Sequence, residues 1–176
     1  MKLRHIFILM FLACASCTRK KPIDIIETKS LETQPVFDGI VIEKQAEPDT
    51  TKKSIKAFVT TTVGKATLSI AYHSPAVKSR IIWGGLVPFD QVWVTGAHMA
   101  TAFECNQDFV IAEKIIPAGK YGLFTIPSKD QWTFILNKNW QQHLADEYNE
   151  SEDIIRVVID TQNSNHQERL RYELVP

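Results

Sequence analysis

Residues 55–73 read IKAFVTTTVGKATLSIAYH, and this stretch decides the fold class. Its first half is rich in Val and Thr, which favour strands, and Gly64-Lys65 can turn the chain. From Ala66 to Tyr72 apolar residues then alternate with smaller or more polar ones, which places the apolar side chains on one face of a strand. The stretch therefore predicts a β-hairpin with one buried face.

Short segments of the same kind recur along the chain, separated by turn residues. The further candidate strands are residues 78–82, 92–95, 101–105, 109–112, 120–126, 132–136, 154–159 and 169–174. Many short strands at near-regular spacing are typical of a sandwich or barrel. Only residues 140–147 have the spacing of a helix, with Trp140 and Leu144 one turn apart. We expect an all-β single domain, a β-sandwich or jelly-roll-like fold with one short helix.

The first sixteen residues have the organisation of a lipoprotein signal peptide. A basic start precedes the apolar run 6–13, and Ala15-Ser16 places small residues before Cys17. The run is shorter than the roughly 20 apolar residues that a membrane-spanning helix needs. We expect cleavage after residue 16 and lipidation of Cys17. Cys14 is a rival lipidation site, and ordinary cleavage or a short membrane anchor are the alternatives.

Residues 17–53 are expected to form the lipidated cysteine and a flexible tether. Thr, Glu, Lys, Asp, Gln and Pro dominate this part of the chain, and such a composition favours a solvated linker. One exception is residues 36–42 (VFDGIVI), which could form a short strand or a docking segment. The β domain is expected to span residues 54–176.

The charge balance argues against nucleic acid as a partner. Acidic and basic residues number 20 each, and removal of Lys2 and Arg4 with the signal peptide would leave a small acidic excess. Proteins that bind nucleic acid usually carry a basic excess. Of the three cysteines, only Cys105 lies in the expected domain, so no internal disulfide is predicted.

Five motifs follow one another through the central part of the chain. They are residues 72–80 (YHSPAVKSR), 85–89 (GLVPF), 92–97 (VWVTGA), 117–127 (PAGKYGLFTIP) and 132–138 (WTFILNK). Together they resemble DUF2911, a family of exported proteins of unknown function found largely in Bacteroidetes. The resemblance covers about residues 54–160 and implies export without implying a reaction. Many members resemble WRTGANEAT where this chain has WVTGAHMAT at 93–101, so a role tied to that Arg, Asn or Glu does not transfer.

A metal site is one hypothesis for the chemistry of the domain. Imidazole and carboxylate ligands suit divalent transition metals, and the candidate ligands are His73, His98, Glu104 and His143. Extended chain separates the Cα atoms of His98 and Glu104 by about 20 Å, so a shared metal requires a bend between them. The alternative is that all four are ordinary polar surface residues.

A ligand site at one loop end of the domain is the other hypothesis. Its candidate residues are His73, Arg80, Trp83, His98 and Tyr121. Aromatic rings with polar edges suit sugars or apolar ligands, and Arg80 could hold an anion, although rings of this kind also fill cores.

These features together predict an envelope protein held on the membrane by its lipid. Thr18-Arg19-Lys20-Lys21 is basic where surface-exported Bacteroidetes lipoproteins carry acidic residues, which predicts that the protein faces the periplasm. We expect the domain to bind a small ligand, a glycan or an envelope protein. The alternatives are a metal-dependent enzyme using the His/Glu site and a structural accessory subunit of an envelope complex.

Overall fold

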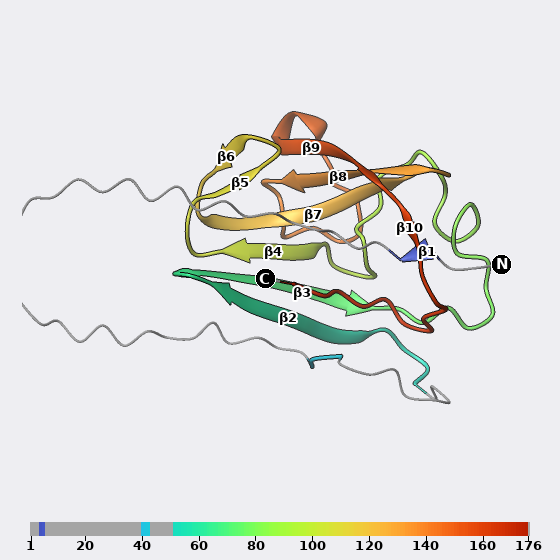
Figure 1. Cartoon of the computed structure of the whole chain (residues 1–176). Helices are drawn as coiled ribbons and strands as arrows, with labels where there is room; N and C mark the ends of the chain where they lie inside the picture. Colours follow the sequence, from blue (N-terminus) through green and yellow to red (C-terminus); the bar gives the residue numbers. More distant parts are fainter. Residues whose placement is uncertain (1–3, 6–39, 43–50, 176) are drawn as a thin grey trace, which may run out of the picture.

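The structure is a computed structural model that describes residues 4–5, 40–42 and 51–175, and its regular elements are almost entirely strands (Figure 1). One antiparallel sheet has the strand order β2-β3-β4-β7-β8-β9. Its strands are β2 (Ile55–Val63), β3 (Ala66–Ser74), β4 (Thr101–Cys105), β7 (Gly119–Pro127), β8 (Gln131–Asn137) and β9 (Asp153–Asp160). A hairpin of β5 (Phe109–Ile111) and β6 (Lys114–Ile116) joins β4 to β7, and β1 (Arg4–His5) pairs with β10 (Gln162–Asn163). The predicted all-β class is confirmed.

The hairpin expected from residues 55–73 is β2-β3. Its register pairs Ile55 with Ser74 and Val63 with Ala66, which leaves Gly64 and Lys65 as the two turn residues. Gly64 has a φ of 63°, and tight two-residue hairpin turns favour glycine because it adopts positive φ without strain.

The main core lies on the face of the sheet predicted from β3. Alternate residues of this strand from Ala66 to Tyr72 are buried there. The same cluster contains Phe103, Leu123, Phe134 and Leu136 from neighbouring strands and Phe109 and Ile116 from the β5-β6 hairpin. Partly buried side chains of the C-terminal segment, Leu170, Tyr172 and Leu174, pack against it. The hairpin and this segment together form the smaller second layer of the fold.

The C-terminal segment is not the strand expected at residues 169–174. The segment forms an isolated β-bridge between Arg169 and Ala76. Leu170 N–H also donates to the carbonyl of Pro75, which follows β3. These backbone groups of the C-terminal segment therefore pair with a loop rather than with a neighbouring strand. The segment covers the core face instead of extending the sheet.

Residues 138–149 cover the opposite face of the sheet. A second buried cluster forms there from Phe124, Ile135, Val94 and Ala100, with Ala145 and Tyr148 packed against it. Close contact with the sheet requires a glycine in β7, since a Cβ on Gly122 would lie 2.8 Å from the carbonyl oxygen of Asn139.

The short helix predicted for residues 140–147 is wrong. Ala100 N–H donates to Gln142 C=O, and Leu144 N–H donates to His98 C=O, so backbone groups of this stretch bond to another loop rather than along a helix. A helix of about two turns gains too few internal bonds to offset its nucleation cost. Within the described residues the helical element is the 3₁₀ turn η1 (Glu150–Glu152).

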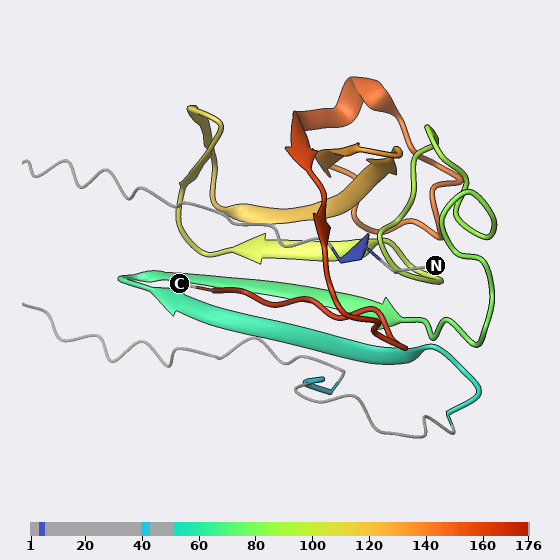
Figure 2. The ribbon, with the colours of Figure 1, turned by 45° about the vertical axis from the view of Figure 1, so that its right-hand side comes forward.

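The sheet twists strongly along its length. In Figure 2 the direction of β9 crosses that of β2. A right-handed twist of about 20–25° per strand pair accumulates to roughly a right angle over such a sheet. At the corner beside the end of β3, the loops after β3 and the C-terminal segment meet (Figure 1).

The N-terminal part of the chain is described only in short pieces. Ile40 forms a parallel bridge with Ala57, accepting from Phe58 N–H and donating to Lys56 C=O, and Ile42 packs against the main core. Residues 40–42 of the stretch 36–42 thus contact the domain, and residues 36–39 lie outside the described residues. Apart from Arg4 and His5, the predicted signal peptide lies outside the described residues, as do Cys14, Cys17 and most of the tether. No described helix has the length and apolar character of a membrane span.

Candidate ligand-binding pocket

A pocket of about 660 Å³ occupies the corner beside the end of β3. Its wall comes from three parts of the chain: the loops of residues 75–98, residues 144–146 and the C-terminal segment 167–172, with Ser54 at the edge. Small-molecule sites commonly measure about 300–1,000 Å³ and have mostly apolar linings. The apolar lining residues of this pocket are Pro75, Ala76, Val77, Ile82, Trp83, Leu86, Val87, Val92, Trp93, Val94, Ala97, Leu144, Ala145 and Leu170.

The loops that build the pocket replace two predicted strands. Residues 78–82 do not form a strand, because Lys78 and Ser79 have φ values of 48° and 55°. Residues 92–95 contribute one isolated bridge, between Trp93 and Thr125 of β7. Thr95 and His98 also have positive φ. Sparsely populated backbone conformations of this kind cluster at functional sites, which makes the loops candidates for binding.

Two tryptophans form the aromatic wall of the pocket, and a third supports them. The ring centroids of Trp83 and Trp132 are 4.6 Å apart, those of Trp83 and Trp93 are 5.4 Å apart, and all three pairs meet edge to face. Trp83 and Trp93 line the pocket, while Trp132 is only 3% exposed and supports them. Edge-to-face packing fixes the orientation of the rings, so this wall is preformed.

Arginines are the main charged groups of the pocket. Arg80 donates from Nε to Val77 C=O over 3.0 Å and from Nη2 to Ala76 C=O over 2.5 Å. Arg169 is 5% exposed and donates to the carbonyls of Thr51, Lys53 and Ser74. Those three bonds join the C-terminal segment to residues just before β2 and to the end of β3.

The remaining charges of the wall have partners nearby. Arg171 forms an ion pair with Glu173, and Asp146 forms one with His143 over 3.1 Å. Asp146 is the one acidic residue among the lining residues, against three arginines. The wall therefore carries a positive excess.

Two lining residues hold a buried polar atom that has no hydrogen-bond partner in the described part of the chain. These atoms are Trp83 Nε1 and Gln167 Oε1. A buried polar group without a partner costs about 1–3 kcal/mol. A ligand that induces a small adjustment of either side chain could recover part of that cost.

Tyr172 connects the C-terminal segment to the strained loop. Its hydroxyl donates to Thr95 C=O over 2.6 Å, and its ring packs edge to face on Tyr72. Burial raises the pKa of the Tyr172 hydroxyl above its ordinary value of 10.0. The group therefore stays protonated and keeps donating at physiological pH.

The structure brings together most of the predicted ligand residues. Arg80, Trp83 and His98 line the pocket. His73 lies directly beside it, with its ring edge to face against His98 at a centroid distance of 5.3 Å. Three of the five predicted residues therefore line the pocket, and a fourth, His73, contacts one of them.

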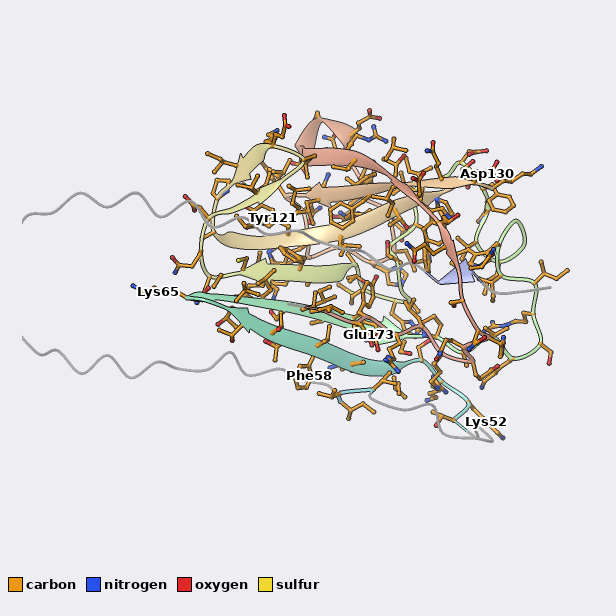
Figure 3. The ribbon with its side chains drawn as sticks, in the orientation of Figure 1. Lys52, Phe58, Lys65, Tyr121, Asp130 and Glu173 are labelled. Atoms are coloured by element: carbon orange, nitrogen blue, oxygen red, sulfur yellow. The ribbon has the colours of Figure 1, made fainter. Side chains whose placement is uncertain are left out.

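Tyr121 is the exception. It lies in β7 opposite Phe103, its hydroxyl donates to Pro117 C=O, and its ring packs on Phe109. Figure 3 places Tyr121 towards the end of the sheet that carries Lys65, whereas Asp130 marks the other end. The ring belongs to the core because alternation along β7 turns it to the buried face, and placing Tyr121 in the ligand site was wrong.

The four predicted metal ligands do not gather at one point. Glu104 pairs with Lys120 at 3.7 Å across β4 and β7, and His143 pairs with Asp146. Of the set, His73 and His98 are in ring contact. Across the described ranges, no three His, Cys, Asp or Glu side chains are placed to hold a metal ion.

Sequence reasoning missed the part of the wall that comes from the end of the chain. Gln167, Arg169 and Tyr172 line the pocket, as do Leu144 and Asp146 of the loop that was expected to be a helix. Arg169 and Arg171 alternate with Leu170 and Tyr172, which resembles an ordinary edge strand. No local signal indicated that these residues face a pocket.

Comparison with known proteins gives one finding. A model of the DUF2911 family, described as a protein of unknown function, matches residues 54–176. The matched region contains every lining residue of the pocket. No curated protein and no solved structure matches the chain.

Proposed function

Because the chain belongs to the DUF2911 family, whose function is unknown, we propose from its structure that it is a small-molecule-binding protein. The observation that carries this proposal is the pocket of about 660 Å³ with its preformed tryptophan wall. Its lining is dominated by aliphatic and indole groups, which suit an apolar ligand body better than a glycan. A glycan would need many polar groups directed at its hydroxyls.

The pocket is preorganised by backbone hydrogen bonds. The backbone N–H groups of Leu86 and Val87 donate to the carbonyls of Ile81 and Ile82, respectively. Trp93 and Thr125 of β7 each donate a backbone hydrogen bond to the other. Loops fixed in this way lose little conformational freedom when a ligand binds. Affinity can then come mainly from the apolar surface that the ligand removes from water.

Filling the pocket is expected to abolish binding of an apolar probe. Ala97 lines the pocket, and Ala97→Phe would add a ring inside it without needing positive φ. We expect the neutral dye N-phenyl-1-naphthylamine to bind the native protein with enhanced fluorescence and to bind Ala97→Phe at least about tenfold more weakly, a loss of roughly 1.4 kcal/mol.

The matched control is Ala118→Phe. Ala118 is exposed in the turn between β6 and β7, outside the pocket, so this variant should bind the dye like the native protein. Equal binding of the dye by the native protein and by Ala97→Phe would exclude the pocket as the site.

The second part of the proposal is that the protein works in the cell envelope, held by a lipid on Cys17. Support comes from the basic start, the apolar run and the small residues before Cys17. Cys17→Ser should move the protein from the membrane to the soluble fraction, whereas Cys14→Ser should leave it with the membrane. Two or more acyl chains anchor stably, so the change should be nearly complete. Unchanged membrane association of Cys17→Ser would contradict the anchor.

A periplasm-facing orientation is part of the same proposal. Protease added to intact cells should leave the native protein uncut, and disruption of the outer membrane should expose it. Rapid cleavage in intact cells would place the domain on the surface.

A further inference from the structure

We propose that the pocket takes an amphipathic monoanion, whose apolar body lies on the Trp83–Trp93 wall and whose anionic group is held by Arg80. This inference rests on the proposed function and adds the chemical class of the ligand. Three observations carry it: the state of the Arg80 guanidinium, the charge balance of the wall and the apolar mouth of the pocket.

Backbone carbonyls hold the guanidinium of Arg80 in place without neutralising its charge. Two of its five N–H donors bond to the carbonyls of Ala76 and Val77, which follow β3 directly. Among the described residues it has no carboxylate partner. A guanidinium held in this way keeps three donors in a fixed arrangement, and a carboxylate or sulfonate can bond to them with little further loss of side-chain freedom.

The other charges around the pocket are already engaged. Arg169 bonds to three backbone carbonyls, Arg171 pairs with Glu173, and Asp146 pairs with His143. An incoming anion would therefore meet a positive wall in which Arg80 offers the available donors.

The mouth of the pocket is apolar next to this arginine. Leu86 and Leu144 line the pocket and yet are 57% and 40% exposed, and Ile81, adjacent to Arg80, is also largely exposed. Leu86 N–H donates to Ile81 C=O, so both side chains belong to one tight turn. Exposed apolar groups beside a cation fit a ligand that has an apolar body and a charged end.

Two dyes with the same ring skeleton test the charge requirement. 8-Anilinonaphthalene-1-sulfonate carries one negative charge, and N-phenyl-1-naphthylamine lacks the sulfonate. We expect the native protein to bind the anionic dye about tenfold more tightly or better, as a charge-assisted hydrogen bond allows. Arg80→Gln should remove most of this difference, because it should weaken binding of the anionic dye far more than binding of the neutral dye.

The matched control is Lys78→Gln. Lys78 is an exposed cation two residues from Arg80 that does not line the pocket, so its removal tests the general field of the loop. It should reduce anion binding less than twofold. Thermal unfolding of each variant, followed by circular dichroism, shows that it is folded. Arg80→Lys keeps the positive charge without the planar guanidinium, and it should retain part of the preference for the anionic dye.

The outcomes separate the two proposals. If both dyes bind equally and Arg80→Gln changes nothing, the monoanion inference is wrong while the binding function stands. If Lys78→Gln weakens the anionic dye as much as Arg80→Gln does, the effect is long-range attraction and Arg80 is not the anion site. If neither dye binds the native protein, or if Ala97→Phe leaves both affinities intact, the proposed function itself fails.

Discussion

Trp132→Ala is expected to lower the free energy of unfolding by about 3–5 kcal/mol, the usual range for removing a large buried aromatic side chain. Trp132 is 3% exposed in β8 and holds Trp83 and Trp93 edge to face. Its loss would leave a cavity and remove the support of the pocket wall. Urea unfolding followed by circular dichroism measures the effect, and the pocket should lose affinity for the neutral dye in the same variant.

Val158→Ala is the control for this prediction. Val158 pairs with Thr133, the neighbour of Trp132, but its side chain is largely exposed on β9. Exposed substitutions usually change stability by less than about 0.5 kcal/mol. A loss below about 1 kcal/mol for Trp132→Ala would mean that the tryptophan cluster contributes little to the fold.

Arg169→Met is expected to destabilise the domain by about 2–4 kcal/mol. Hydrogen bonds from charged donors contribute about 1.5–3 kcal/mol each. The loss is less than the sum of three such bonds because water can reach the part-buried carbonyls of Thr51 and Lys53 in the variant. The guanidinium joins Thr51 and Lys53 at the start of the domain to Ser74 at the end of β3. Methionine fills the same volume but donates no hydrogen bond. Arg169→Lys should also destabilise, because an ammonium cannot reproduce the planar fork.

Arg156→Met is the matched control for the buried arginine. Arg156 is exposed on β9 and pairs with the exposed carboxylate of Glu150 and with Asp153, whose side chain is 6% exposed. We expect a smaller loss than for Arg169, because the Glu150 pair is exposed and Asp153 keeps its hydrogen bonds from Asn137 and Tyr148. Equal losses for the two variants in urea unfolding would show that the three carbonyl bonds of Arg169 have no special role.

The parts of the fold that follow from local pattern were predictable. Alternation from Ala66 to Tyr72 and the Gly64-Lys65 turn specify a hairpin within one short stretch, and its register confirms it. Residues 78–95 show the limit of that reasoning. Their Val, Ile and Trp content resembles strands, yet Gly84 and Gly85 allow tight turns, and the apolar side chains face a pocket instead of a sheet.

The candidate site was predictable only where its residues lie in loops near the motifs. Trp83 precedes Gly84 and His98 follows Gly96-Ala97, which indicated loop positions, and both residues line the pocket. Tyr121 also lies next to a glycine, Gly122, but the alternation of β7 buries it in the core. Arg169 could not be found from the sequence, since its role depends on carbonyls 95 to 118 residues away.

That separation has a consequence for the order in which the molecule forms. The β2-β3 hairpin needs only neighbouring residues and can close early, whereas the pocket wall requires the segment of Tyr172 to return to Thr95 and that of Arg169 to reach Thr51. Contacts so distant in sequence carry a large loop-closure entropy and usually slow folding. A chain still emerging from a ribosome can therefore have strands before it has the pocket, which is complete only when residues 167–172 have docked.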